Sequence, residues 1–299
     1  MFKKLSPHSF AILQALFVTV LWASSWVLIK FGLADIPALT FAGLRYMLAF
    51  LVLLPVAWRR GAFAALRGQP RPVWVRLAVL GVLFYAVTQG AQFLGLALLP
   101  AITVNLLLNF TTIIVALMGM IWLNEHLTPR QWGGILLTLV GAGVYFFPIT
   151  VLSEQRWGVV IVLIGVLANA GSGILGRAVN RAETLPPLAV TVVSMGFGAV
   201  VLLGSGIAVQ GLPQIPLRGW IFIAWLAVVN TAFAFTLWNH TLRTLTAVES
   251  SVIAGTMLVQ IPLLAWLFLG ENPTGKEVAG MALVGIGTLL VQWRRERRA

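Results

Sequence analysis

The sequence predicts an all-α integral membrane protein with ten transmembrane helices, arranged as two inverted five-helix repeats. The chain has 299 residues, of which 60% are hydrophobic and 9% charged, whereas a soluble domain carries about 25% charged residues. Apolar segments near the ~20 residues that cross a bilayer recur along the whole chain. The second half also repeats the first at a spacing of about 146 residues.

Each predicted span is a long apolar run bounded by charged, proline or glycine residues. The first is expected to remain as an uncleaved helix rather than a signal peptide, because its apolar run continues through Trp26. The ten predicted spans are Phe10–Lys30, Pro37–Ala57, Leu77–Leu98, Ile102–Leu123, Trp132–Phe147, Trp157–Leu175, Leu188–Val209, Trp220–Leu242, Ser250–Leu269 and Val278–Trp293.

The basic residues between the spans indicate the orientation of the chain, because cytoplasmic loops carry an excess of Lys and Arg. If the N-terminus is cytoplasmic, only Lys30, Arg156, Arg218 and Lys276 lie outside. The cytoplasmic side then has Lys3, Lys4, Arg59, Arg60, Arg67, Arg71, Arg76, Arg130, Arg177, Arg181, Arg243, Arg294, Arg295, Arg297 and Arg298. Both termini are therefore predicted to be cytoplasmic, in a bacterial-type inner membrane.

The internal repeat keeps one register over both halves. LNEHLT at residues 123–128 aligns with LGENPT at 269–274, Gly134 with Gly280, and Gly141 with Gly287. Since each repeat holds five helices, the second copy enters the membrane from the opposite side. The predicted repeats are residues 1–150 and 151–299. Inverted repeats are typical of secondary transporters, whose substrate site lies near the midplane where the halves meet.

The sequence that carries the repeat is ALLPAITVNLLLNFTTIIVALMGMIWLNEHLTPRQWGGILLTLVGAGV in half one and LTAVESSVIAGTMLVQIPLLAWLFLGENPTGKEVAGMALVGIGTLL in half two. Together with the LWASSWVLIKFG start, it resembles the EamA-type members of the drug/metabolite transporter superfamily. The resemblance implies a carrier whose central cavity is lined by the first, third, fourth, sixth, eighth and ninth helices. It also implies amino-acid export as one activity. The family often has a proline within the fourth helix of each half, where this chain has Thr111-Thr112 and Pro262.

Polar side chains inside the spans are the candidate substrate-binding residues, because such groups are costly in lipid and usually face the bundle interior or a cavity. Each could instead form a hydrogen bond that joins two helices. The predicted set is amphipathic and mostly neutral: Trp22, Ser25, Trp26, Arg45, Tyr85, Gln89, Gln92, Asn105, Asn109, Asn169, Ser172, Asn230, Trp238 and Ser251.

Arg45 is the one charge between Pro37 and Ala57. It is either a structural arginine bonded to backbone carbonyls or to amides such as Gln89 or Gln92, or the partner of a substrate carboxylate. None of the eight acidic residues is predicted near mid-membrane, where proton-coupled carriers commonly place a carboxylate. Glu249, near the cytoplasmic end of the ninth span, is the nearest candidate for such a carboxylate. A facilitator or exporter without a buried proton site is favoured.

Other motifs exclude several classes of protein. The G-x-G-x-x-G at residues 171–176 lies inside an apolar helix without the strand and acid that dinucleotide binding needs, so close helix packing explains it better. With no cysteine and three dispersed histidines, no metal site, cofactor or enzyme chemistry is predicted. The net charge of +12 is spread over short loops and tails, which argues against nucleic acid as a partner.

The sequence therefore predicts a transporter of small metabolites, with amino acids or related zwitterions as the preferred class, working by alternating access. The expected partners are a small-molecule substrate and membrane lipid, with the chain a monomer or weak homodimer. A non-transporting membrane scaffold or accessory subunit is the alternative function. Drugs or other amphipathic metabolites are the alternative substrates.

Overall fold

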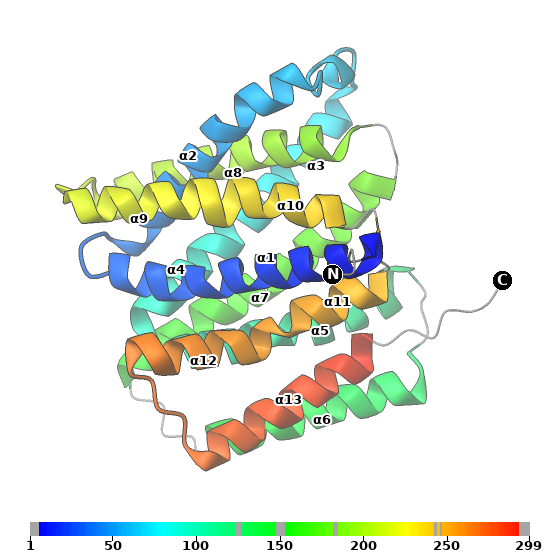
Figure 1. Ribbon diagram of the computed structural model, residues 1–299, viewed down its shortest axis with the longest axis vertical. Helices are drawn as coiled ribbons and strands as arrows, with labels where there is room; N and C mark the ends of the chain where they lie inside the picture. Colours follow the sequence, from blue (N-terminus) through cyan, green and yellow to red (C-terminus); the bar gives the residue numbers. More distant parts are fainter. Residues whose placement is uncertain are drawn as a thin grey trace, which may run out of the picture. The chain divides into compact units, whose positions relative to one another are not determined.

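The computed structural model describes residues 6–123, 127–147, 153–181, 185–241, 244–245 and 247–292. The chain divides into two compact units, each built from segments of both sequence halves. Unit 1 comprises Met1–Val27, Pro100–Ser153 and Phe233–Ala299, and unit 2 comprises Leu28–Leu99 and Glu154–Ala232. The described part of both units is helical (Figure 1).

The helices of unit 1 begin with the first part of α1. They are α1 (Pro7–Gly32), α5 (Ala101–Leu123), α6 (Pro129–Phe146), α10 (Ala234–Thr241), α11 (Ala247–Gly255), α12 (Met257–Leu269) and α13 (Gly275–Gln292). Unit 2 contains the end of α1 and then α2 (Ala38–Arg59), η1 (Ala64–Leu66), α3 (Arg71–Gly81), η2 (Val82–Thr88), α4 (Gln89–Leu98), α7 (Ser153–Arg181), α8 (Pro187–Gln210), α9 (Leu217–Ala227) and most of η3 (Val228–Phe233).

Each predicted span falls on one or more helices over most of its length, and the predicted ends Leu242 and Trp293 lie outside the described residues. Eight of these helices are long and apolar enough to cross a membrane. The helices α6 and α13, with 18 residues each, are not among those eight. A multi-pass membrane protein is thus supported, while the crossing of the membrane by ten helices stays a prediction.

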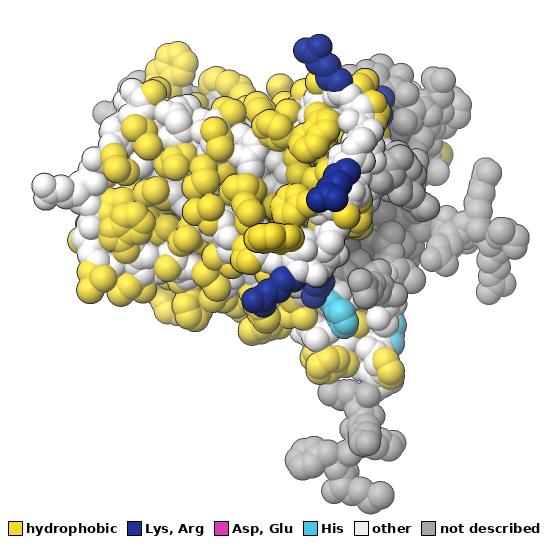
Figure 2. Space-filling view, turned by 90° about the horizontal axis from the view of Figure 1, so that it is seen from above, with side chains coloured by type: hydrophobic (Ala, Val, Ile, Leu, Met, Phe, Trp, Pro, Cys, Tyr) yellow, Lys and Arg dark blue, Asp and Glu magenta, His cyan; other side chains and the backbone are white. Residues whose placement is uncertain are grey.

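The exposed surface of the helices is apolar, as expected for contact with lipid rather than water. Large hydrophobic side chains such as Phe17, Leu51, Val200 and Trp266 are each about half exposed or more. In the view of Figure 2, hydrophobic side chains cover most of the described surface, and few Lys and Arg side chains are visible.

In unit 1, α6 and α13 lie side by side (Figure 1) and meet through glycines. A Cβ atom on Gly134 would lie 2.7 Å from the carbonyl oxygen of Gly287, and one on Gly141 would lie 2.7 Å from that of Gly280. Residues rising along α6 meet residues falling along α13, so the two helices run antiparallel. Because only glycine leaves room for this approach, the backbones themselves form the contact.

Two helix starts in unit 1 are capped by side chains, and the capping residues occupy matching positions in the sequence repeat. Thr128 and Gln131 form a capping box at α6, in which the Thr128 hydroxyl accepts from the Gln131 backbone N–H at 3.3 Å. At α13, the Thr274 hydroxyl accepts from the Glu277 N–H at 3.3 Å, and Glu277 accepts from the Thr274 N–H at 2.6 Å. Both pairs satisfy N–H groups that a helix start leaves open.

A carboxylate caps α5 as well. Glu271, in the loop after α12, accepts hydrogen bonds from the backbone N–H groups of Ala101 at 2.7 Å and Ile102 at 3.0 Å. An anion is favoured at this position, because the helix N-terminus carries partial positive charge. The end of α12 is thereby fixed to the start of α5.

Unit 2 packs around α2, α8 and the α3–η2–α4 rod. Phe41 and Phe93 are fully buried and meet edge to face, with ring centroids 5.3 Å apart. At one end of α2, the side-chain oxygen of Gln210 accepts from the Leu39 N–H at 2.8 Å. Glycines allow the close approach of α8 here too, since a Cβ on Gly206 would lie 2.7 Å from the Thr40 nitrogen.

The G-x-G-x-x-G stretch of α7 does not pack as expected. A Cβ on Gly173 would meet nothing within 4 Å, and those on Gly171 and Gly176 would meet only leucine methyl groups, at 3.9 and 3.6 Å. The close approaches on α7 occur earlier, where Cβ atoms on Gly158 and Gly165 would lie 2.8 Å from Leu99 and 2.7 Å from Ala91. Packing between helices therefore does not explain that motif.

Candidate functional site

Arg45 lies inside unit 2 with 4% of its surface exposed. Its Nε donates to the Thr231 hydroxyl at 3.1 Å. The guanidinium carbon lies 5.1 Å from the Tyr46 ring centroid and 5.9 Å from that of Phe93, within range of cation–π attraction. Among the described residues, Arg45 has no other hydrogen bond and no carboxylate at ion-pair distance. The buried charge is thus only partly compensated.

The suggested bonds from Arg45 to Gln89 or Gln92 are wrong, because its hydrogen-bond partner is Thr231 on η3. The Thr231 hydroxyl donates its only proton to the Leu226 carbonyl at 2.8 Å, so a lone pair remains for the arginine. Neither glutamine amide has a hydrogen-bond partner among the described residues. Both side chains are partly exposed within their helix.

Two π-helical segments occupy equivalent positions in the sequence repeat. The first is η2, Val82–Thr88, and the second is η3, Val228–Phe233; their first residues differ by 146 positions (228 − 82). In each, a threonine hydroxyl donates to the carbonyl five residues earlier, from Thr88 to Leu83 and from Thr231 to Leu226, both at 2.8 Å. Such wide turns often mark functional sites.

Tyr85 lies on η2 and is 4% exposed. Its ring meets that of Tyr46 with centroids 5.6 Å apart. Because Tyr46 also contacts Arg45, the two predicted site residues Arg45 and Tyr85 belong to one cluster. The cluster joins α2, η2, α4 and η3.

In unit 1, Trp22 on α1 contacts two aromatic rings of α10. Its ring centroid lies 5.3 Å from that of Phe235 and 5.1 Å from that of Trp238. The Trp22 indole nitrogen Nε1 is buried and has no hydrogen-bond partner among the described residues. Trp26 is 6% exposed. Trp22 and Trp238 thus form a cluster, to which the structure adds Phe235.

Ser25 and Ser172 form hydrogen bonds within their own helices. The Ser25 hydroxyl donates to the Trp22 carbonyl at 2.6 Å, and that of Ser172 donates to the Asn169 carbonyl at 2.8 Å. Asn230 is fully buried beside Thr231. Ser251 is on α11, but its side chain lies outside the described residues.

Asn105 bonds to another helix. Pro262 on α12 has no N–H, so the carbonyl of Leu258, four residues earlier, loses its usual helical donor. The Asn105 amide donates to this carbonyl at 3.4 Å, and the Asn109 amide donates to the Asn105 carbonyl at 2.8 Å. The first bond joins α5 to α12 and supports the interhelical alternative for Asn105, whereas Asn109 bonds within its own helix.

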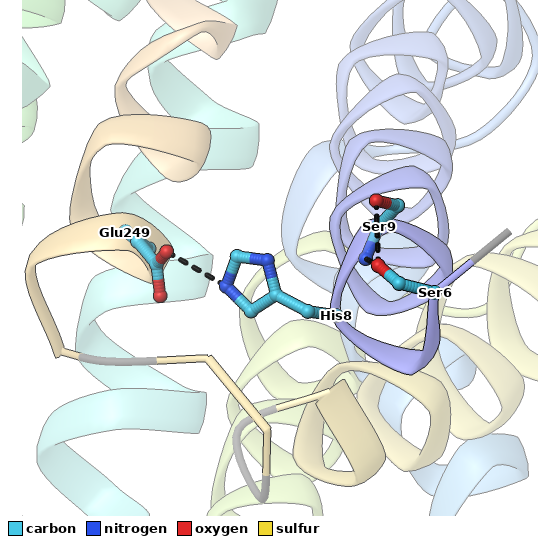
Figure 3. Close-up of polar contacts among 4 residues, drawn as sticks. All are labelled: Ser6, His8, Ser9 and Glu249. Atoms are coloured by element: carbon cyan, nitrogen blue, oxygen red, sulfur yellow. Dashed lines mark hydrogen bonds and ion pairs between the residues drawn. The ribbon is translucent and has the colours of Figure 1, made fainter.

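The acids of the described region lie at helix ends. Glu249 is in the first turn of α11, and its Oε1 lies 2.8 Å from Nε2 of His8 on α1 (Figure 3). Both side chains are partly exposed. The contact joins residues 241 positions apart, which the sequence reading did not pair.

Comparison with known proteins connects this geometry to a family. The sequence profile of the EamA-like transporter family matches the chain twice, over residues 9–147 and 156–293. The chain belongs to the EamA-like transporter family. The double match fits a chain of two repeats, and the resemblance read from the sequence is confirmed.

Individual relatives of this EamA-like chain are distant but match over almost its whole length. An uncharacterized transporter of Bacillus subtilis, YvbV, is 28% identical over 97% of this chain and 93% of its own. An uncharacterized inner membrane transporter of Escherichia coli, YedA, is 26% identical over 97% of this chain and 90% of its own. A probable amino-acid metabolite efflux pump of Escherichia coli is 25% identical over 94% and 95%.

A solved crystal structure has the same fold as this EamA-like chain. It superposes with a TM-score of 0.66 and 20% identity, covering 95% of this chain and 97% of the other. At this identity, the likeness supports the fold alone.

One polar cluster of the EamA-like chain was missed. Gln260 of α12 donates from Nε2 to the hydroxyls of Thr19 at 3.1 Å and Thr256 at 3.0 Å. The signal was present in the sequence, because Gln260 is an amide within an apolar span. Sequence position alone did not show that Thr19, more than 200 residues away, would meet it.

Proposed function

We propose that the chain is a secondary transporter of the bacterial inner membrane for small zwitterionic metabolites, with amino acids or related compounds as substrates. The observation that carries this proposal is Arg45, a buried guanidinium without a carboxylate partner among the described residues. The family supports transport rather than catalysis. The relative named as a probable amino-acid metabolite efflux pump supports the substrate class.

A charge buried without a full set of partners is costly, and inside a membrane it usually serves a function. Thr231 and two aromatic rings compensate Arg45 in part. The terminal nitrogens Nη1 and Nη2 have no hydrogen bond to a described residue. This forked pair of donors matches the two oxygens of a carboxylate, which a zwitterionic substrate would supply.

A carrier must open its substrate site first to one side of the membrane and then to the other. We infer alternating access between two inverted five-helix repeats, residues 1–150 and 151–299. Three recurring features support this arrangement: the capping boxes at Thr128 and Thr274, the two π-helical segments, and the reciprocal glycine contacts of α6 and α13. In the glycine contacts, Gly134 meets Gly287 and Gly141 meets Gly280, which is the exchange of partners that a two-fold relation produces.

The topology can be tested with single cysteines, because the natural chain contains none. With both termini cytoplasmic, Arg67→Cys faces the cytoplasm and Gln214→Cys faces outward. In intact cells, a membrane-impermeant maleimide should label the cysteine at position 214 and leave that at position 67 unlabelled until the cells are broken. The reverse pattern would contradict the orientation, and labelling of both would contradict the proposed spans.

We further propose that transport does not require a buried proton carrier. The acids whose side chains are described, Asp35, Glu249, Glu271 and Glu277, lie in loops or first turns. Flux in liposomes should therefore persist after a protonophore collapses the pH gradient. Abolished flux would sink this part of the proposal and would make Glu249 the first residue to examine.

The decisive experiment is reconstitution in liposomes with a panel of radiolabelled amino acids. Arg45→Gln should lower the apparent affinity for a transported amino acid at least about 30-fold, because the bound substrate carboxylate loses its charged partner. Arg59→Gln, at the exposed end of the same helix, should leave the affinity unchanged. Unimpaired flux in folded Arg45→Gln would refute the carboxylate site. Absence of flux for every panel member in the natural protein would favour a scaffold, and flux confined to drugs would favour the other substrate class.

A further inference from the structure

The polar cluster of Gln260, Thr19 and Thr256 lies where the ninth predicted span is broken. The regular helix α11 ends at Gly255, Thr256 forms the break, and α12 begins at Met257. The break is confined to one residue, and Thr256 keeps helical dihedral angles, with φ −62° and ψ −22°. Gln260 lies one turn into α12, and its Nε2 reaches Thr256 at 3.0 Å and Thr19 of α1 at 3.1 Å. One amide of α12 thus connects Thr19 of α1 to Thr256 at the break.

The protons of this cluster fix the orientation of the amide. The Thr19 hydroxyl donates to the Leu16 carbonyl at 2.8 Å, and the Thr256 hydroxyl donates to the Ile253 carbonyl at 2.6 Å. Each hydroxyl has one proton, so both offer only lone pairs to Gln260. The amide NH2 must therefore face the two threonines, and the carbonyl oxygen Oε1 must point away from them.

That oxygen is left without a partner. Gln260 Oε1 is buried and accepts no hydrogen bond from the part of the chain that the structure describes. Buried polar atoms are nearly always hydrogen-bonded in folded proteins, so an exception calls for an explanation. The threonines cannot supply one, because their protons are already donated within their own helices.

A second unpartnered atom lies on the same face of α1. Trp22 follows Thr19 by three residues, which puts the two side chains on one face, about one turn apart. The Trp22 Nε1 is a buried donor without an acceptor, and its ring packs against Phe235 and Trp238. A free acceptor and a free donor are therefore offered beside an aromatic surface.

We propose that Gln260 Oε1 and Trp22 Nε1 bind the polar end of the transported substrate. Gln260 Oε1 accepts a hydrogen bond from a substrate ammonium group, and Trp22 Nε1 donates to a substrate oxygen. The rings of Trp22, Phe235 and Trp238 hold an apolar side chain. Because Gln260 Oε1 carries no net charge, it suits the ammonium group of a zwitterion, which has no net charge either. A carboxylate at this position would instead favour a substrate with a net positive charge. This inference rests on the proposed function as a transporter of zwitterions.

The test compares an amino acid that the natural protein transports with its N-acetylated analogue as competitors of uptake in liposomes. The natural protein should prefer the free amine. Gln260→Leu should reduce this preference about 10-fold by weakening competition from the amine and leaving that from the N-acetyl analogue unchanged. Gln260→Glu, which retains an acceptor oxygen, should keep the preference.

Two further variants separate binding from folding. Trp22→Phe retains an aromatic ring and removes only the N–H, so it should weaken both competitors equally. Thr288→Val serves as the matched control, because the Thr288 hydroxyl on α13 is another buried atom without a partner and has no role in the proposed site. Its competition profile should equal that of the natural protein.

The outcomes distinguish this inference from the proposed function. If the natural protein moves amino acids but folded Gln260→Leu retains the full preference for the amine, the subsite is refuted and transport stands. An equal effect of Thr288→Val on the preference would also refute it. If the natural protein moves no amino acid, the proposed function fails and the subsite fails with it.

Discussion

Two regions of unit 1 differ in how far their polar groups are hydrogen-bonded within the protein. Between α6 and α13, glycines bring backbone against backbone, and the cap of α6 is tied across to α13 by the Gln131 amide, which donates to the Val291 carbonyl at 3.2 Å. Around Gln260 and Trp22, by contrast, two buried polar atoms have no hydrogen-bond partner among the described residues, and on α13 this holds only for the Thr288 hydroxyl. Where polar groups are paired within the protein, the contact can hold helices together, and we call the contact of α6 with α13 the frame. Where a buried polar group has no partner, the contact is incomplete, and a ligand that supplies the partner can bind with a gain in free energy. Arg45 in unit 2 resembles the incomplete kind.

The largest expected effect is on the frame. In Gly141→Leu, the new Cβ would lie 2.7 Å from the Gly280 carbonyl and 2.8 Å from the Val284 nitrogen, so the two backbones must separate. We expect a loss of about 3 kcal/mol or more in stability, at the upper end of overpacking. Fluorescence-detected size-exclusion chromatography of detergent extracts, with heating, measures the loss.

Gly143→Leu is the control for this prediction. A Cβ on Gly143 meets nothing within 4 Å, although the residue lies on the same helix. It should therefore leave the melting temperature of the protein unchanged or slightly raised, because glycine weakens a helix. If the two variants melt alike, the glycine contacts do not hold α6 to α13.

A smaller effect is expected at the incomplete site of unit 2. Thr231→Val removes the hydroxyl that accepts from Arg45 Nε at 3.1 Å and keeps the size of the side chain. Hydrogen bonds to charged groups contribute about 1.5–3 kcal/mol, so the apparent substrate affinity should fall roughly 10-fold or more. The measurement is concentration-dependent uptake in liposomes.

Thr231→Ser should restore affinity, because it returns the hydroxyl. Should Thr231→Val lower thermal stability while substrate affinity stays unchanged, Arg45 and Thr231 would belong with the frame rather than with the site. Arg45 could then not be grouped with Gln260 and Trp22.

The smallest effects concern the caps, and they test whether the two halves are equivalent. Thr128→Ala and Thr274→Ala each remove a capping hydroxyl at matching positions. Loss of such a cap costs about 1 kcal/mol. Thermal unfolding should show similar shifts for the two variants. A shift for one alone would indicate that the repeat is preserved in sequence but not in stability.

Much of the fold could be predicted from the sequence, because hydrophobic length and turn residues act locally. The start of α8 at Pro187 and the glycine that follows its end, Gly211, are examples. The kind of protein and the family followed from composition and from the repeated LNEHLT and LGENPT motifs. These signals need no knowledge of which helix contacts which.

The site was harder to predict, because its contacts join residues far apart in the chain. Arg45 and Thr231 are 186 positions apart, and Thr19 and Gln260 are 241 apart. A polar residue inside a span can be recognised in the sequence, but its partner cannot. Asn105 shows the limit, since its bond depends on a proline in another helix that frees the Leu258 carbonyl.

The carboxylate of Glu271 has a mechanical consequence. By holding the first two N–H groups of α5, it couples the loop beyond α12 to another helix through two short bonds. If α12 tilts about its break at Thr256, its far end must carry the start of α5 with it or break both bonds. The glutamate after the ninth predicted span then couples the position of α12 to that of α5.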